Sequence, residues 1–144
     1  MERFSEKSLL ALGEFYVYGL IDPRTDKIFY IGKGTGNRIF EHEKEHVSNP
    51  DSDKLKLKTI SEIVAEGETV KRIIINSNLS EKEALAAEAS LINIFNYIGD
   101  INLTNIISGH HSSDVLTVEE FEQIYGAEVL NKDDIKHKVL VIKI

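Results

Sequence analysis

Alternating apolar and polar positions near the start of the chain predict a β-hairpin. Residues 14–21 alternate aromatic and β-branched side chains with other types, as strands do, and residues 27–31 repeat the pattern. Between them, residues 22–26 (DPRTD) predict a turn, because proline presets the backbone and aspartate side chains can cap it. We therefore expect two neighbouring antiparallel strands.

A glycine-rich loop and two helices are expected next. The loop, residues 32–37 (GKGTGN), should open a helix that runs to about Val47. A second helix is expected from about Lys54 to just before Gly67, because glycine commonly follows a helix end. Its apolar face should carry Leu57, Ile60 and Val64.

The longest predicted helix lies in the second half of the chain. Residues 69–75 predict an apolar strand that residues 76–78 (NSN) should end. Ser80 and Glu83 then form a capping-box pattern for a helix that reaches about Tyr97.

Weaker patterns follow toward the C-terminus. Residues 99–113 look irregular, residues 117–125 predict a short helix, and residues 139–144 alternate like a last strand. These elements together predict a mixed α/β (α+β) fold.

Composition is that of a globular domain. The chain has 144 residues, of which 42% are hydrophobic and 28% charged, enough for one domain with a core. It lacks cysteine, which excludes disulfides and thiolate zinc sites and fits a reducing compartment. Residues 1–7 do not resemble a signal peptide, and no apolar run reaches membrane-span length. We therefore expect an intracellular protein without a membrane partner.

The net charge of −7 argues at first against a nucleic-acid partner, but its distribution changes the picture. Residues 113–134 hold seven acids and one base, whereas residues 24–72 hold ten bases and nine acids. We expect residues 1–112 to form the main domain and residues 113–144 an acidic extension, packed on it or leading to a further domain. The acidic stretch is either a solvated surface or a regulatory element.

One carboxylate on the long helix is placed unusually. Glu88 falls in the middle of an apolar stripe formed by Ala84, Leu91, Ile92 and Phe95. A carboxylate aimed toward a core costs free energy unless it meets a cation or hydrogen-bond donors. Taken alone, Glu88 could also reach solvent from the edge of the stripe or pair with an arginine.

Arg38 and His42 are a second pair of candidates. They lie four residues apart on the helix expected after the glycine loop, so they share a face. Arginine suits the planar recognition of a phosphate. The alternative is two solvated residues on an amphipathic helix. Lys54, Lys56 and Lys58 are expected at the solvated end of the next helix, where they could contact a DNA backbone.

Two rival motifs can be weighed. The glycine loop has Asn37 where the dinucleotide-binding fingerprint needs glycine, and it follows a hairpin instead of a βαβ unit. Residues 42–46 match HExxH of zinc peptidases, with both His42 and His46 on one helix face and Glu62 or Glu66 as a third ligand. The two residues between are charged, whereas a buried zinc helix favours apolar ones there.

Several residues form one ordered set along the chain: Tyr16-Val17-Tyr18, Tyr30-Ile31-Gly32, Lys33, Arg38, His42, Glu88 and Asn105. This set resembles the GIY-YIG nuclease superfamily and covers roughly residues 14–111. The stretch from Asp22 to His42 is most similar to the branch of LEM-domain and ankyrin-repeat nucleases and their bacterial relatives. Tyr16 stands where the family name has glycine, a position that varies among members.

The resemblance implies a central three-stranded antiparallel sheet flanked by helices. It also implies a one-metal endonuclease that hydrolyses DNA, including branched DNA, with Glu88 as the single protein ligand of Mg²⁺ or Mn²⁺. Arg38 would stabilise charge on the phosphate. A nuclease-like fold that holds nucleic acid or protein without cutting is the alternative, and a zinc peptidase is a distant third.

The resemblance assigns roles to the remaining residues as well. Tyr18 would act as general base with Tyr30 positioning it, and Lys33 would favour the phenolate. His42 would contact the phosphate or share in proton transfer. Gly32, Gly34 and Asn105 would support the site. His110 and His111 receive no role.

Overall fold

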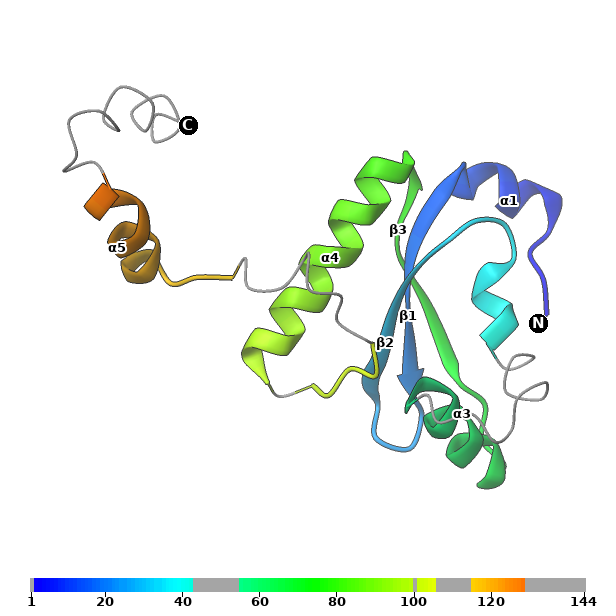
Figure 1. Ribbon diagram of the computed structural model, residues 1–144. Helices are drawn as coiled ribbons and strands as arrows, with labels where there is room; N and C mark the ends of the chain where they lie inside the picture. The colour runs from blue at the N-terminus through cyan, green and yellow to red at the C-terminus, as the bar shows by residue number, and fades with distance from the viewer. Residues whose placement is uncertain (1, 43–54, 100, 106–114, 129–144) are drawn as a thin grey trace. The chain divides into compact units, whose positions relative to one another are not determined.

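The computed structural model describes residues 2–42, 55–99, 101–105 and 115–128 (Figure 1). The chain divides into two compact units, residues 1–112 and residues 113–144. The strand expected at residues 139–144, as well as His46, His110 and His111, lies outside the described residues.

The first unit is built on one antiparallel sheet of three strands in the order β2-β1-β3. The strands are β1 (Phe15–Asp22), β2 (Lys27–Gly34) and β3 (Lys71–Leu79). Helices flank this sheet, so the predicted α+β class is confirmed. None of the helices in the described ranges is long and apolar enough to cross a membrane.

Two strands run further than their patterns predicted. β2 continues to Gly34 instead of ending before the glycine loop, because its last residues still pair with β1. β3 continues to Leu79, although residues 76–78 were expected to end it. The pairing accommodates the asparagines through register shifts and a positive φ of 56° at Asn78, a conformation that asparagine tolerates.

A β-bulge in β2 determines which rings share a face of the sheet. Leu20 pairs with Tyr30, and the next residue of β1 pairs with Ile28. Phe29 is therefore an extra residue in β2, and such a bulge re-aims side chains. As a result, Phe29 and Tyr30 both pack with the cluster that contains Tyr18, although they are consecutive.

One face of the sheet is covered by α4 (Glu81–Ile98), which contacts all three strands. The predicted capping box is confirmed: Ser80 Oγ accepts from the Glu83 N–H at 3.1 Å, and the Glu83 carboxylate accepts from the Ser80 N–H at 2.9 Å. Gly99 ends the helix with a φ of 79°. The predicted apolar stripe packs on the buried side chains of Val17 and Ile31. Its predicted members are Ala84, Leu91, Ile92 and Phe95, and Ala87 packs there as well.

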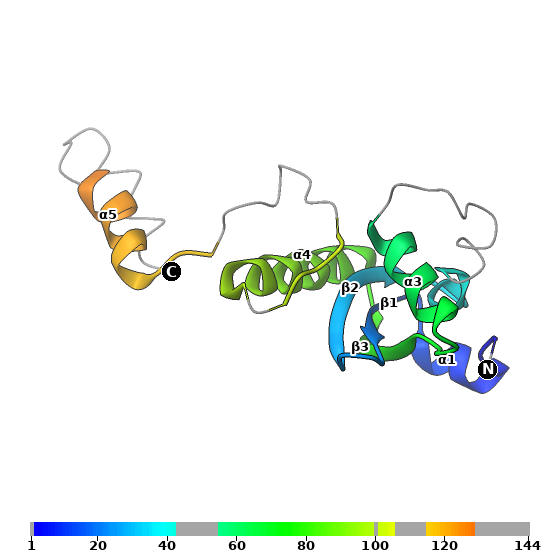
Figure 2. The ribbon, with the colours of Figure 1, turned by 90° about the horizontal axis from the view of Figure 1, so that it is seen from below.

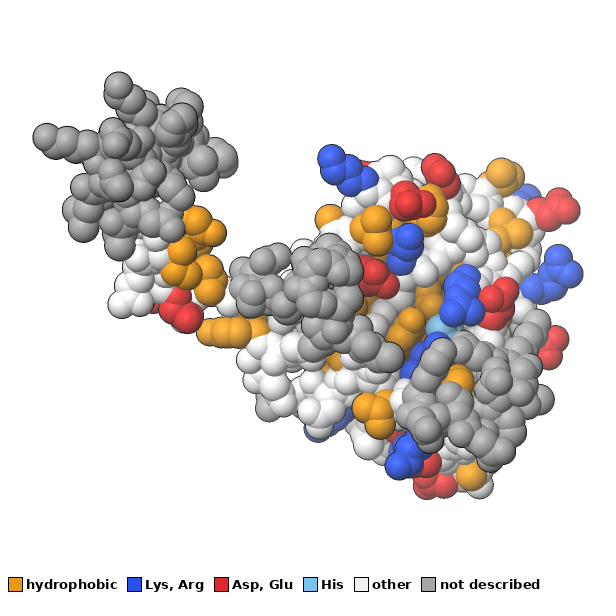
Figure 3. All heavy atoms as spheres, viewed as in Figure 1, with side chains coloured by type: hydrophobic (Ala, Val, Ile, Leu, Met, Phe, Trp, Pro, Cys, Tyr) orange, Lys and Arg blue, Asp and Glu red, His pale blue; other side chains and the backbone are white. Residues whose placement is uncertain are grey.

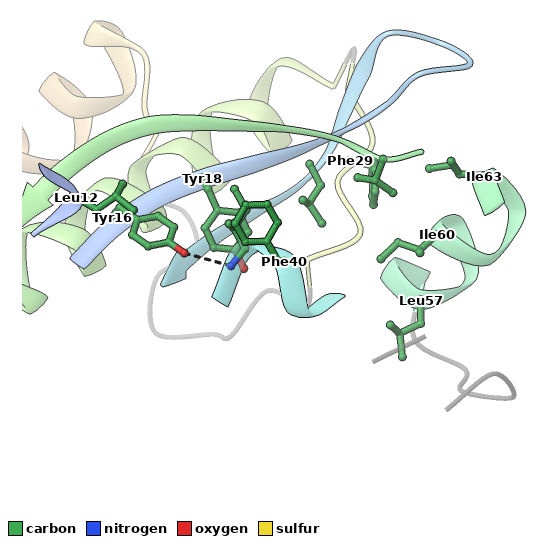
Figure 4. Close-up of a cluster of buried hydrophobic side chains, with 11 residues drawn as sticks. Leu12, Tyr16, Tyr18, Phe29, Phe40, Leu57, Ile60 and Ile63 are labelled. Atoms are coloured by element: carbon green, nitrogen blue, oxygen red, sulfur yellow. Dashed lines mark hydrogen bonds between the residues drawn. The ribbon is translucent and has the colours of Figure 1, made fainter. Parts of the chain in front are cut away.

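Three short helices lie on the other side of the sheet (Figures 1 and 2). They are α1 (Glu6–Leu12), the 3-10 helix η1 (Arg38–Phe40) and α3 (Leu55–Ala65). The apolar pattern did not predict α1. η1 stands where an α-helix was expected to begin. Figure 4 shows the buried side chains that these helices and the sheet enclose.

The inward face of α3 differs from the predicted one. Val64 is 43% exposed, whereas Ile63 is fully buried. Both residues continue the spacing from Ile60, by four and by three residues, so periodicity alone could not choose between them. Gly67 follows the helix with a φ of 77°, as expected of a residue after a helix end.

The second unit contains α5 (Val118–Glu128), where a short helix was predicted. Thr117 and Glu120 bond reciprocally at its start, each at 3.0 Å, as a capping box. Phe121 and Tyr125 stack along it with their ring centroids 4.5 Å apart.

Candidate active site

Three of the predicted residues meet on the η1 side of the sheet. The hydroxyl of Tyr18 is hydrogen-bonded to Nε2 of His42, and the two side chains are buried, with residue exposures of 1% and 2%. The ring of Tyr30 lies edge-on to His42 with 5.1 Å between centroids, and 6.3 Å from the ring of Tyr18. We call these three residues the Tyr–His cluster.

Each member of the cluster comes from a different element. Tyr18 lies on the central strand β1, Tyr30 lies two residues before Gly32 on the same face of β2, and His42 follows η1. Tyr16 fixes η1 in place, because its hydroxyl donates to the Gly36 carbonyl at 2.8 Å and accepts from the Ile39 N–H at 3.1 Å (Figure 4). Tyr16 is fully buried and acts as an anchor for the loop.

Two glycines leave room for the tyrosine rings. Gly32 pairs with Tyr18, and a Cβ atom there would lie 2.6 Å from Tyr18 Cζ and 2.7 Å from its hydroxyl. Gly34 pairs with Tyr16, and a Cβ atom there would lie 3.2 Å from both Tyr16 Cζ and Tyr18 Cε1. Glycine at 32 therefore allows the Tyr18 ring to lie across β2, a reason that the sequence pattern alone did not supply.

Tyr18 and His42 are both uncharged near pH 7. Burial, reinforced by neighbouring Tyr30, raises the pKa of Tyr18 well above its ordinary value of 10. Burial also lowers the pKa of His42 to about 3, with added repulsion from Lys56 and then Arg38. A neutral phenol and a neutral imidazole can each donate or accept, so the tautomer that carries its proton on Nδ1 is the one in which Nε2 accepts the Tyr18 proton.

Arg38 stands at the rim of the cluster. Its side chain is 39% exposed, and its Nη1 lies 3.1 Å from a carboxylate oxygen of Glu41. Its positive charge lowers the pKa of Tyr18 and of His42, so it lies within electrostatic reach of both. The structure thus brings Arg38 and His42 to one place, with the arginine partly in solvent and the histidine buried.

Lys56 is a member of the site that the sequence prediction missed. The expectation of a solvated lysine is wrong, because the residue is only 9% exposed and its Nζ lies 5.0 Å from the centroid of the Tyr30 ring. A signal was present: Lys56 lies four residues before Ile60 and seven before Ile63, on the apolar stripe of α3.

Glu88 is half-buried on α4, within the predicted stripe. Its negative charge raises the pKa of Tyr18, so the carboxylate acts on the Tyr–His cluster. In the described part of the chain, no three His, Asp or Glu side chains converge as a metal-binding group. A single carboxylate fits Mg²⁺ or Mn²⁺, since these ions accept one protein ligand together with waters and phosphate oxygens.

Lys33 lies on the other face of the sheet. Its Nζ is 5.1 Å from the centroid of the Phe15 ring, and Phe15 packs with the cluster of Val17 and Ile31 beneath α4. The cation whose charge lowers the pKa of Tyr18 is Arg38, and burial outweighs it, so no phenolate is favoured in this structure. A catalytic role for Lys33 stays a prediction.

Asn105 supports the edge strand of the site. Its Oδ1 accepts from the Ile31 N–H at 3.0 Å, and its Nδ2 donates to the Ile31 carbonyl at 2.7 Å. Thr104 N–H donates to the Phe29 carbonyl at 2.7 Å. β2 is an edge strand, so these bonds satisfy backbone groups that would otherwise lie open. The segment also fixes the strand that carries Tyr30.

The HExxH alternative finds little support in the described residues. Glu62 and Glu66, its suggested third ligands, both contact Arg24, whose Nη2 lies 3.5 Å from Glu62. The Nε2 of His42 is hydrogen-bonded to Tyr18.

Figure 3 shows basic and acidic side chains interspersed among apolar ones on the face in view.

The fold and the paired tyrosines define the class of protein: an α+β domain of the GIY-YIG nuclease type. A family model for the LEM-3-like GIY-YIG domain matches residues 15–134, and the chain belongs to this family. The predicted resemblance, including its branch, is thereby confirmed. The match continues beyond residue 112 into the second unit. Searches among curated proteins and among solved structures found no match.

Proposed function

We propose that this protein is a metal-dependent endonuclease that hydrolyses DNA phosphodiester bonds. The observation that carries the proposal is the buried hydrogen bond between Tyr18 and His42, with the charge of Arg38 beside it. A neutral phenol and a neutral imidazole in contact form a route for a proton. Membership of a nuclease family supports a phosphodiester as the substrate.

The proposed proton route removes the need for a standing phenolate. Because its pKa is raised, Tyr18 can accept a proton only while it gives up its own. We propose that the oxygen of a water molecule bonds to phosphorus while its proton passes to the Tyr18 oxygen. The Tyr18 proton then moves to Nε2 of His42. The bond from phosphorus to the leaving oxygen breaks, and that oxygen takes a proton from bulk water.

Arg38 and Glu88 supply the charges of the proposed reaction. The guanidinium of Arg38 is partly exposed and can hold a non-bridging phosphate oxygen, where charge grows in the transition state. Glu88 would hold one Mg²⁺ or Mn²⁺ ion, which when bound stabilises negative charge on the phosphate. The field of Glu88 at Tyr18 is the observation that supports this placement.

The substrate is proposed to be DNA, including branched DNA, and the compartment intracellular. The lack of cysteine supports a reducing compartment, and the LEM-3-like family supports a nucleic-acid substrate. Selectivity for branched DNA is proposed by analogy with the family branch.

A cleavage assay tests the proposal. Plasmid DNA and a branched duplex are incubated with the protein in Mg²⁺ or Mn²⁺ and in excess chelator. We expect cleavage only with metal, and a loss of at least about 100-fold in Glu88→Gln. Glu81→Gln is the matched control, because Glu81 lies exposed on the same helix, and it should cut like the parent.

The alternative is a nuclease fold that binds nucleic acid without cutting it, which the acidic net charge favours. Binding of DNA with no metal-dependent cleavage would support that alternative. If Glu88→Gln cuts as fast as Glu81→Gln, cleavage does not depend on Glu88 and the proposed active site is wrong. A zinc-dependent activity lost in His46→Ala but kept in Glu88→Gln would point to a peptidase instead.

A further inference from the structure

We propose that Lys56 is a second phosphate-binding cation of the site, which contacts the phosphate under attack together with Arg38. The inference rests on the proposed function and deepens it. It starts from Lys56, a buried lysine on α3, an element that contributes none of the residues predicted for the nuclease site.

The position of Lys56 places its charge at the Tyr–His cluster. Its Nζ lies 5.0 Å from the Tyr30 ring centroid, an arrangement that attracts an ammonium to the ring face. Tyr30 in turn contacts the ring of His42 at 5.1 Å. The apolar stem of Lys56 shares the helix stripe with Ile60 and Ile63, so packing directs the ammonium toward the cluster.

The charges around the cluster fit an anion. Lys56 and Arg38 come from separate elements, and both act on His42. Two carboxylates also act on this region: Glu41, which pairs with Arg38, and Glu88 on α4, whose charge raises the pKa of Tyr18. A bound divalent ion at Glu88 would offset that charge. The remaining positive charge suits a phosphodiester, which carries one negative charge.

Lysine and arginine would bind the phosphate in different ways. The guanidinium can bond two oxygens in a plane, whereas an ammonium is a compact point charge with three donors. A phosphate that binds between them offsets their repulsion of a proton on His42. Substrate binding would thereby make His42 a better acceptor for the Tyr18 proton at the moment when transfer is required.

Single-turnover cleavage at saturating protein concentration tests this assignment. Lys56→Met keeps the apolar stem and removes the charge, and we expect it to slow cleavage by about 100-fold. Lys56→Arg keeps a positive charge and should cut at least about tenfold faster than Lys56→Met. Lys7→Met is the control, because Lys7 is an exposed lysine on α1, and its rate should stay within about twofold of the parent.

Thermal melting of each variant separates a structural role from contact with phosphate. If Lys56→Met does not fold, Lys56→Gln replaces it. If Lys56 has only a structural role, the bulkier side chain of Lys56→Arg should lower the melting temperature as well. The assignment is overturned if the uncharged variant folds and cuts as fast as Lys7→Met, or if folded Lys56→Arg is as slow as the uncharged variant.

A binding measurement keeps this inference apart from the proposed function. Should the parent protein not cut, the endonuclease proposal fails, and DNA binding is then measured by fluorescence anisotropy at several salt concentrations. The slope of the logarithm of the binding constant against the logarithm of salt concentration measures the phosphate contacts. We expect this slope to become shallower by about one in Lys56→Met, as for the loss of one phosphate contact. An unchanged salt dependence, or no DNA binding by the parent, would overturn the assignment of Lys56.

Discussion

The hydroxyl of Tyr18 shares a buried hydrogen bond with Nε2 of His42, 24 residues further along the chain. One partner lies on the central strand and the other follows η1, so the bond joins the sheet to the segment that carries Arg38. Burial keeps both groups neutral, because it raises the pKa of Tyr18 and lowers the pKa of His42. The bond thus links the stability of the domain to the proposed proton route.

Removing the Tyr18 hydroxyl should abolish the proton route. We expect Tyr18→Phe to slow single-turnover cleavage by about 100- to 10,000-fold, as for the loss of a general base. His42 also loses a buried partner, which should lower the free energy of unfolding by about 1–3 kcal/mol. Tyr97→Phe, an exposed tyrosine on α4, should match the parent in both. A Tyr18→Phe rate within a few-fold of the parent would exclude the route.

His42 should make the domain less stable in acid. Its pKa of about 3 in the folded chain lies below that of an unfolded chain, which is about 6.5. Between these values the unfolded chain binds a proton that the folded chain does not. Stability therefore rises with pH across this window and falls as pH drops, by up to about 1.4 kcal/mol for each pH unit.

Urea unfolding at pH 7.5, 6 and 5 measures this effect through the difference between the parent and His42→Gln. Other histidines and carboxylates titrate in both proteins, so the difference isolates His42. We expect the parent to lose more stability than the variant as pH falls. Parallel losses in the two proteins would contradict the neutral, buried state of His42.

A methyl group at position 32 should displace the Tyr18 ring. Gly32→Ala places a Cβ atom 2.6 Å from Tyr18 Cζ, so either the ring or the strand must move. We expect a loss of about 1–3 kcal/mol in unfolding free energy and a matching loss of cleavage. Gly67→Ala is the comparison, because its Cβ meets no atom and only the positive φ of 77° is strained. Gly67→Ala should lose stability but keep activity per folded molecule.

The side chain of Asn105 should stabilise β2 from its open edge. Asn105→Ala removes both bonds to the Ile31 backbone and should lower the free energy of unfolding by about 1–3 kcal/mol. Asn102→Ala, at an exposed position three residues earlier, should have little effect. Hydrogen exchange of the Ile31 amide gives a local readout, and it should speed up in Asn105→Ala alone. Unchanged exchange would show that the asparagine is dispensable for the edge.

Local patterns in the sequence predicted much of the fold. The hairpin, the capping box at Ser80 and the apolar stripe of α4 depend on residues close in the chain, so alternation and helical spacing reveal them. The ordered set of tyrosines, Arg38, His42 and Glu88 sufficed to recognise the family, because the order and spacing of these residues can be read from the sequence alone.

Long-range contacts explain what the patterns missed. The bulge at Phe29 depends on how β2 pairs with β1, and it puts Phe29 beside Tyr30 on the face of Tyr18. The burial of Lys56 depends on α3 docking against that same face. Lys33 was expected to assist Tyr18, but strand alternation carries it to the α4 side. The bulge and the burial of Lys56 are contained in no local pattern, whereas alternation along β2 already indicated the face of Lys33.

By itself, the sequence determined the hairpin and the long helix, the family and the types of residue available for phosphodiester chemistry. The tertiary structure decided which of them meet. It joined Tyr18 to His42, brought Lys56 to the ring of Tyr30 and left Lys33 on the opposite face. The physical reason is that charge and proton affinity in a site depend on burial and on neighbours within a few ångströms, which chain folding brings together from distant positions.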